Sequence, residues 1–365
     1  MEKLLAALLF LLPCEAFACG AFRLKAADGT VISARTMEFG YDVKYALAAS
    51  PRGRNFASPG PADKPAMKWK SRYGYAGVSV FGNDDMIVDG MNEAGLAASG
   101  LWYDAGAKWP EIKPGAEDKA LAHTMLISWL LGSFANVAEA KAALANTTVF
   151  GLYVPQMKAV PPLHFAVYDG SGAAIVIEAA NGETRVYDNP IGVMTNAPDF
   201  PWMVSNLRNY TGLSPALAPA ADYSGVKLLP TGHGSGMSGL PGDITPPSRF
   251  VKLAAMLHFA DTPADAKAAL NLAEHVSNGV DIVSGMAVDR DEKGAIVSSE
   301  TTQWAAFRDL TNRILYLRTY DSMTLRKVDL GKLDFSGGVK RTALYGDAEA
   351  VIDITNRFSA PEIAK

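Results

Sequence analysis

The chemistry of this chain centres on its two cysteines, Cys14 and Cys19. Residues 4–12 form an unbroken apolar run, and Ala16-Phe17-Ala18 has the small-x-small pattern that signal peptidase recognises. We therefore expect residues 1–18 to be a signal peptide. Its removal discards Cys14 and makes Cys19 both the first residue and the sole thiol.

A cysteine at an amino terminus carries its own base. The α-amino group has an unperturbed pKa near 7.7 to 8.0, so its neutral form can accept the thiol proton directly or through one water molecule. A nearby cation favours the thiolate. Arg35 lies on a strand that we expect to return beside the strand starting at Cys19. Glu38 follows three residues later, where it could orient the amine or hold Arg35.

Export has consequences for localisation and for the alternatives to catalysis. We expect a periplasmic or secreted protein without a membrane span, because the first apolar run is far shorter than the roughly 20 residues of a spanning helix and no second run is long enough. A solitary cysteine in an oxidising compartment is either a reactive thiol or a lipid attachment point. The residues before Cys14 and Cys19 make poor lipidation signals. The competing hypothesis is a lipid-anchored or catalytically silent binding protein.

Composition and motifs bound the other functions. The net charge of -4, without a basic cluster, argues against nucleic acid as a partner. The five histidines show no metal-ligand spacing, so we expect neither a metal nor a cofactor. A papain-type pairing of Cys19 with a distant histidine remains open. The run from Gly232 to Gly236 lacks the strand and lysine of a phosphate-binding loop, and we interpret it as a mobile loop near the site.

The expected elements occur in separate blocks of strands and helices within one domain, residues 19–365. Residues 21–25 and 31–36 flank the hairpin signal Asp28-Gly29. The other expected strands are 77–81, 95–103, 164–169, 174–179, 301–308 and 314–320, and the expected helices are 118–131, 137–145, 248–259 and 263–276. Such blocks predict an α+β fold in which helices cover antiparallel sheets.

Several segments, taken in order, resemble the choloylglycine hydrolase and penicillin V acylase family of amino-terminal-nucleophile hydrolases. The resemblance spans nearly the whole chain after residue 18 and implies a four-layer αββα sandwich of two antiparallel sheets. The matching segments are Cys19-Gly20-Ala21-Phe22, Arg35-Thr36-Met37-Glu38, residues 89–96, Thr195-Asn196-Ala197-Pro198, residues 239–243 with 248–250, and residues 316–321.

The resemblance implies a role for each candidate residue. Cys19 is the expected nucleophile, Arg35 and Arg249 flank the site, and Asn196 supplies an oxyanion-hole amide. Trp102 falls where the family places a second oxyanion donor, a backbone N–H, and its side chain is expected to shape an acyl pocket together with Phe22 and Phe39. Two positions depart from the family pattern. The family commonly has aspartate at the position of Glu38, and many relatives have a hydroxyl residue directly after the nucleophile, where this chain has Gly20-Ala21.

Each candidate also has an ordinary structural interpretation. Arg35 and Glu38 could be a surface pair, Asn196 a turn residue, Arg249 a surface or ion-pairing residue and Trp102 a core residue. Asp89 and Asn92 are interpreted as a turn before a buried strand. The expected partner is a small-molecule N-acyl amide, either penicillin V, an N-acyl homoserine lactone or a conjugated bile salt, with a weak preference for the first two. A homo-oligomer is left open.

Overall fold

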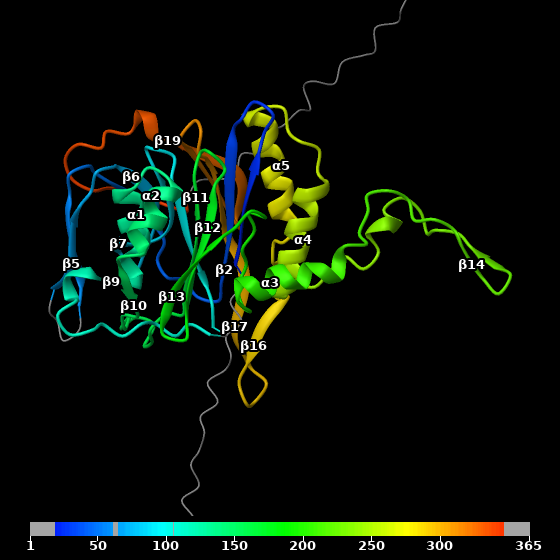
Figure 1. Cartoon of the computed structure of the whole chain (residues 1–365), viewed down its shortest axis with the longest axis horizontal. Coiled ribbons are helices and arrows are strands. Elements are labelled where there is room, and N and C mark those ends of the chain that lie inside the picture. The colour runs from blue at the N-terminus through cyan, green and yellow to red at the C-terminus, as the bar shows by residue number, and fades with distance from the viewer. Residues whose placement is uncertain (1–18, 61–64, 105, 347–365) are drawn as a thin grey trace, which may run out of the picture.

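Two large antiparallel sheets form the centre of the molecule, and helices cover their outer faces (Figure 1). The computed structural model describes residues 19–60, 65–104 and 106–346. The signal peptide expected at residues 1–18 lies outside the described residues. One sheet has the order β1 (Cys19–Lys25), β2 (Val31–Phe39), β17 (Ile296–Asp309), β18 (Ile314–Thr319) and β19 (Ser322–Asp329), with β16 (Ala287–Arg290) also paired to β17.

The second sheet supplies the opposite wall of the space between the sheets. Its strand order is β13 (Glu183–Asp188), β12 (Ala174–Ala180), β11 (Leu163–Tyr168), β8 (Ala97–Trp102), β7 (Asn83–Asn92), β6 (Tyr75–Val80), β3 (Ala46–Ser50) and β20 (Lys340–Ala343). A hairpin of β4 (Asn55–Pro59) and β5 (Pro65–Lys70) stands apart from both sheets.

Helices pack on both outer faces and complete four layers. The helix α1 (Leu126–Ser133) packs on β7 and β8, and α2 (Val137–Leu144) packs on β12. On the other side, α4 (Pro246–Phe259) and α5 (Ala266–Asn278) cover β1, β2 and β17. Side chains of Asn136 and Asp265 cap the first turns of α2 and α5. The expected four-layer αββα sandwich is confirmed.

The expected hairpin is confirmed, but the helix expected at residues 118–131 is wrong in its first half. The β1–β2 hairpin is present, and Gly29 takes a φ of 93°, which suits glycine in its turn. The helix begins only at Leu126. Residues before it form short 3-10 turns and β9 (Ala120–Ala122), which pairs with β10 (Thr148–Phe150). The periodicity was ambiguous because residues 120–131 are all buried, and a buried short strand and a buried helix have the same apolar pattern.

The turn expected at Asp89 and Asn92 begins only at Asn92, the last residue of β7, whereas Asp89 lies within that strand. Asn92 ends this strand: its Oδ1 accepts hydrogen bonds from the backbone N–H groups of Ala94 and Leu96. Asp89 lies within the sheet and is fully buried. A buried carboxylate is tolerated there because hydrogen bonds from Ser99 and Arg308 compensate its charge.

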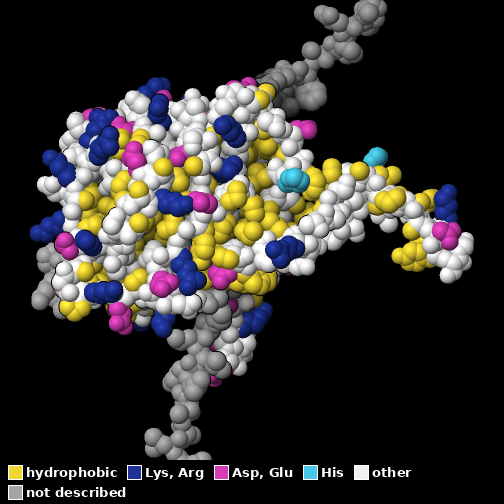
Figure 2. All heavy atoms as spheres, viewed as in Figure 1, with side chains coloured by type: hydrophobic (Ala, Val, Ile, Leu, Met, Phe, Trp, Pro, Cys, Tyr) yellow, Lys and Arg dark blue, Asp and Glu magenta, His cyan; other side chains and the backbone are white. Residues whose placement is uncertain are grey.

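An arm projects from the side of the molecule that carries α4 and α5 (Figure 1). It follows α3 (Phe200–Asn206) and includes the short hairpin of β14 (Ala221–Tyr223) and β15 (Val226–Leu228), with apolar side chains at its exposed tip (Figure 2). The run from Gly232 to Gly236 belongs to this arm and hydrogen-bonds to it through Ser235 and Gly236, so the expectation that it lies near the site is wrong. Among the described residues, no helix has the length and apolarity needed to cross a membrane.

Candidate active site

Cys19 begins β1, and a segment that is distant in sequence lies along the free edge of this strand. Ala21 and Met194 exchange two backbone hydrogen bonds of 2.8 Å each, which places Asn196 beside Cys19. Thr195 Oγ1 donates to the carbonyl of Pro246 at 2.9 Å. The segment that carries Asn196 is therefore tied both to β1 and to the first turn of α4, the helix that carries Arg249.

Two side chains bind the backbone of Cys19. The nitrogen of Cys19 donates to Asn196 Oδ1 at 2.7 Å, and Arg249 Nη1 donates to the Cys19 carbonyl at 2.7 Å. Arg249 Nη2 also donates to Asn196 Oδ1 at 2.7 Å, while Asn196 Nδ2 donates to the Trp102 carbonyl at 2.9 Å. Because Oδ1 faces only donors and Nδ2 faces an acceptor, this network determines the orientation of the amide. Nδ2 retains a second N–H for another acceptor.

The backbone of Trp102 faces the same place. Tyr103 donates its backbone N–H to Pro162 on the β11 side at 2.7 Å. Backbone groups alternate in direction along an antiparallel strand, so the N–H and carbonyl of Trp102 point to the opposite edge of β8. The Trp102 carbonyl accepts the hydrogen bond from Asn196 there. The backbone of Trp102 and the side chain of Asn196 are thus adjacent, as the expected oxyanion site requires.

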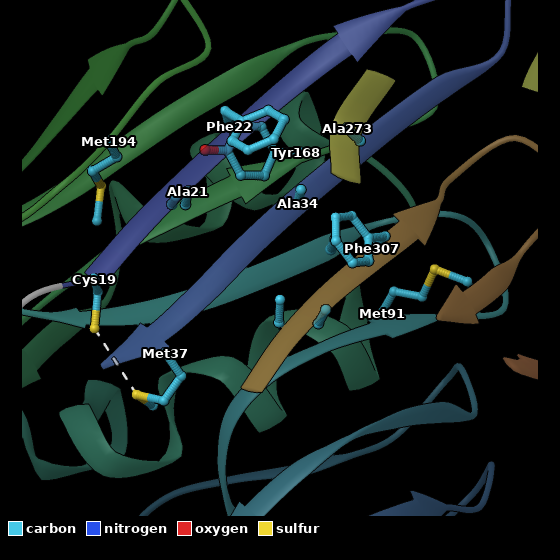
Figure 3. Close-up of a cluster of buried hydrophobic side chains, with 14 of the residues drawn as sticks. Cys19, Ala21, Phe22, Ala34, Met37, Met91, Tyr168, Met194, Ala273 and Phe307 are labelled. Carbon is cyan, nitrogen blue, oxygen red and sulfur yellow. Dashed lines mark hydrogen bonds between the residues drawn. The ribbon is translucent and has the colours of Figure 1, made fainter. Parts of the chain in front are cut away.

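The thiol of Cys19 lies in a buried pocket beside a guanidinium. Arg35 Nη2 is 3.7 Å from Cys19 Sγ, and the sulfur of Met37 is 3.9 Å away (Figure 3). The Cys19 residue is only 2% exposed. The positive charge of Arg35 therefore stabilises a negative charge on this sulfur in a place where little water competes.

Arg35 and Glu38 lie on opposite faces of β2, since side chains alternate along a strand. Arg35 shares the inner face with Cys19 and donates to the Val88 carbonyl at 2.8 Å. Glu38 faces the helical layer, where its Oε1 accepts from Thr302 Oγ1 at 2.7 Å. The alternative in which Glu38 holds Arg35 is therefore wrong. The spacing of three residues already contained this information, because an odd spacing reverses the face of a strand.

Burial dominates the electrostatics of Glu38. It raises the pKa of this carboxyl from 4.5 to about 7, and the charge of Arg249 opposes the rise. Burial also lowers the pKa of Arg249, while the negative charges of Glu38 and Cys19 oppose that change. Glu38 Oε2 is buried and has no hydrogen-bond partner among the described residues. Glu38 and Arg249 are thus an electrostatically linked pair directly behind the cysteine.

A cavity lies between the sheets next to Cys19, and the space outside the atoms, including open solvent at its mouth, is about 690 Å³. Its walls are mostly apolar, and Trp102 and Phe39 form an edge-to-face pair in them with ring centroids 6.0 Å apart. The residues that the sequence did not point to include Val43, Tyr45, Val80, Phe81, Met86, Ile87, His123, Ile127, Met157, Pro161, Leu163 and Phe165. They come from many strands and loops, so no local pattern marks them as a group.

Phe22 does not line this cavity. It lies opposite Ala34 on the face of β1 that also holds Gly20, and a side chain at Gly20 would meet Leu253 of α4. Phe22 is almost fully buried in the hydrophobic core (Figure 3). The expectation that it shapes the acyl pocket is therefore wrong: it stands one residue out of phase with Cys19 and Ala21.

Burial tests the ordinary structural interpretations, in which these candidates are surface or turn residues. Arg35, Glu38, Asn196 and Arg249 are each at most 2% exposed, so none of them is a surface residue. Asn196 does lie in an irregular segment, yet its side chain is used by Cys19, Arg249 and Trp102 rather than by a local turn.

No described histidine makes a hydrogen bond to Cys19. His123 lines the same cavity, but its Nδ1 accepts from the backbone N–H of Leu152 at 3.0 Å, and burial lowers its pKa to about 4. The neutral ring then carries its proton on Nε2 and has no remaining lone pair to act as a base. His164 is occupied with Glu178 and with the Thr195 carbonyl. Within the described ranges, no cluster of His, Cys, Asp or Glu could hold a metal ion.

Comparisons with known proteins agree with this geometry. A sequence model for linear amide C–N hydrolases of the choloylglycine hydrolase family matches residues 19–347. The bile salt hydrolase/transferase of Clostridium perfringens is 31% identical over 330 residues, which cover 90% of this chain and 97% of that protein. The penicillin V acylase of Pectobacterium atrosepticum is 33% identical over 176 residues, 46% of each chain.

A solved structure shows the same similarity at the level of the fold. A crystal structure of a variant of the conjugated bile acid hydrolase from Clostridium perfringens superposes with a TM-score of 0.80 at 27% identity. The match covers 92% of this chain and all of that one. With the family model matching nearly all of the residues after position 18, the chain belongs to the choloylglycine hydrolase family of linear amide C–N hydrolases.

Proposed function

We propose that this protein hydrolyses an N-acyl amide with Cys19 as its nucleophile, after residues 1–18 have been removed during export to the periplasm or the medium. The observation that carries the proposal is the convergence of Arg35, Asn196 and Arg249 on the sulfur, nitrogen and carbonyl of one residue. The match of the family model, which begins at Cys19, also supports it.

Removal of residues 1–18 changes the chemistry of one atom. In the full chain the nitrogen of Cys19 belongs to a peptide bond and is not basic. In the processed chain the same nitrogen is a primary amine: one hydrogen is donated to Asn196 Oδ1, and the lone pair can accept the thiol proton. The guanidinium of Arg249 favours the neutral amine over the ammonium form because like charges repel.

The proposed reaction uses groups that the structure brings together. The Cys19 thiolate attacks the amide carbonyl, and the oxyanion is held by the second N–H of Asn196 Nδ2 together with a backbone N–H. The amine of Cys19 then protonates the leaving nitrogen, and water hydrolyses the thioester. One preorganised donor of this kind contributes on the order of 10²- to 10³-fold in rate.

The cavity determines which part of the substrate this chain recognises. Its apolar and aromatic walls suit the acyl group of an amide, whereas the polar amine portion must leave through the mouth. Penicillin V, long-chain N-acyl homoserine lactones and conjugated bile salts all combine an apolar acyl group with a small polar amine. We infer an apolar carboxylic acid as the acyl component and take penicillin V as the first substrate to test.

The test is the ratio of kcat/KM for penicillin V to kcat/KM for glycocholate, measured on processed protein with Cys19→Ala as the blank. A ratio well above one assigns a penicillin acylase specificity and makes acyl homoserine lactones the next substrates. A ratio well below one assigns bile salt hydrolysis. Cys19→Ala with wild-type turnover would refute the mechanism.

Intact mass distinguishes this proposal from a lipid-anchored or silent binding protein. A mass that corresponds to an unmodified chain starting at Cys19 is the expected result. An acylated amino terminus would exclude the amine as a base and would favour the lipid-anchored alternative. An unmodified terminus without turnover of penicillin V, glycocholate or a long-chain acyl homoserine lactone would favour the silent binding protein.

A further inference from the structure

A second buried charge cluster lies behind Arg35, between the two sheets. Asp89 Oδ1 accepts a hydrogen bond from Arg308 Nη1 and a 2.6 Å hydrogen bond from Ser99 Oγ. Arg308 Nη1 also donates to Ser99 Oγ at 2.8 Å, and Arg308 Nε donates to Ser33 Oγ at 3.0 Å. All four side chains are buried. The cluster joins β2 and β17 of one sheet to β7 and β8 of the other.

Arg35 connects this cluster to the cysteine. Its Nη1 lies 4.0 Å from Asp89 Oδ1 and donates to the carbonyl of the preceding residue, Val88. Its Nη2 contacts Cys19 Sγ, and its guanidinium carbon lies 5.1 Å from the ring centroid of Trp304. One end of the guanidinium is thus held by β7, and the other end faces the sulfur.

The charges in this cluster do not cancel. Asp89 is the only ion-pair partner that the described residues provide for Arg35 and for Arg308, and it lies closer to Arg308. Two guanidiniums therefore share one carboxylate, and a net positive charge remains at Arg35, on the side of Cys19. A cation that is fixed in place and not neutralised favours the thiolate form of a neighbouring cysteine, and this arrangement provides one.

We propose that Asp89, itself anchored by Arg308 and Ser99, is a positioning residue that holds Arg35 against the sulfur of Cys19. This inference rests on the proposed function, since it assumes that Cys19 acts as a thiolate. Asp89 does not touch the reacting atoms and acts only through Arg35.

The test measures the rate of Cys19 alkylation by iodoacetamide as a function of pH in processed protein. Cys19 is then the sole thiol, because Cys14 lies within residues 1–18. The charged and titratable groups around the thiol are Arg35 on its own face of the sheet, the amine of Cys19 itself, and Tyr45, which precedes β3. Arg249 and Glu38 lie on the helical side of the same strands. These groups other than Arg35 remain the same in all variants, so differences between midpoints report on Arg35 and Asp89.

Arg35→Met serves as the benchmark and should raise the pH of half-maximal alkylation, because the thiolate loses its cation. Asp89→Asn should move the midpoint in the same direction by about one pH unit, with about a tenfold lower rate below the midpoint, because Arg35 is released. If Asp89 acted only through its charge, Asp89→Asn would lower the midpoint, because removal of a nearby negative charge favours the thiolate. A lower or unchanged midpoint overturns the proposal.

Two further variants keep the result interpretable. Asp188→Asn breaks the exposed ion pair with Lys141 and should leave the midpoint unchanged. Should Asp89→Asn fail to fold because Arg308 is stranded, Ser99→Ala removes one donor to Asp89 without stranding a charge. It should raise the midpoint by a smaller amount, and an unchanged midpoint would count against the proposal. If Arg35→Met itself has no effect, the role of Arg35 in the proposed function fails instead.

Discussion

Replacing Asn196 with alanine, together with a matched control variant, separates the proposed catalytic role of this side chain from its structural role. The amide serves the Cys19 nitrogen, Arg249 Nη2 and the Trp102 carbonyl at distances of 2.7 to 2.9 Å. Its second N–H is the proposed oxyanion donor. Loss of that donor should lower kcat by about 10²- to 10³-fold. Loss of the three hydrogen bonds should also lower the free energy of unfolding, by roughly 1 to 3 kcal/mol for each buried group left unpaired.

Asn189→Ala is the matched control. Asn189 stabilises the same irregular segment, because its Nδ2 donates to the Val193 carbonyl at 3.0 Å and its Oδ1 accepts from the Gly192 N–H at 2.8 Å. It has no contact with Cys19. Both variants should therefore lose stability, but only Asn196→Ala should lose turnover.

The assay compares kcat on the best substrate with urea unfolding of the same samples, after intact mass has confirmed the processed terminus. Asn189→Ala should retain a kcat near that of the wild type at a temperature where it is folded. If folded and processed Asn196→Ala keeps more than about a tenth of the wild-type kcat, the oxyanion assignment is refuted. If both variants lose kcat to the same extent, the effect belongs to the segment and not to the amide.

Three other predictions address the terminus, the buried acid and the cavity. A chain with one extra residue before Cys19 should bind substrate but show no turnover by single-turnover kinetics, because its nitrogen is a peptide nitrogen; wild-type rates would contradict the amine as base. Burial raises the pKa of the Glu38 carboxyl from 4.5 to about 7 in the folded protein. Between these two pH values the folded state therefore binds one more proton than the unfolded state. The free energy of unfolding should fall by about 3 kcal/mol as pH rises from 4.5 to above 7, and Glu38→Gln should remove this dependence in pH-dependent urea titrations. Trp102→Ala should raise KM for aryl-acyl substrates with little loss of stability, whereas Phe22→Ala should cost about 3 to 5 kcal/mol in unfolding free energy and leave the KM of folded enzyme unchanged.

Local patterns predicted the elements that carry their signals within a few residues. The β1–β2 hairpin follows from Asp28-Gly29 between two apolar runs. The helix expected at residues 248–259 is α4, which begins two residues earlier, at Pro246-Pro247, because proline suits a first helical turn. The strand β7 was missed because a buried charge at Asp89 resembles a turn residue when its partner is unknown. That partner, Arg308, lies 219 residues away.

The candidate site shows the same division. The sequence alone indicated Cys19 as the candidate nucleophile, because a signal peptide pattern and a cysteine count are properties of the linear chain. Side chains also alternate between the two faces of a strand, so the positions of Arg35 and Glu38, and of Ala21 and Phe22, already place the members of each pair on opposite faces. The family resemblance indicated Asn196 and Arg249, but no local pattern relates them to a cysteine that lies 177 and 230 residues away.

Tertiary structure alone decided the surroundings of each of these residues. Packing of the two sheets against each other encloses the cavity, places Asp89 behind Arg35 and leaves Glu38 in a buried layer that raises its pKa to about 7. The physical reason is that distances and dielectric surroundings arise from contacts between distant segments, whereas sequence patterns report only on neighbours along the chain. The chemistry proposed for Cys19 could be inferred from the sequence, whereas the environment of its thiol and nitrogen could be known only from the fold.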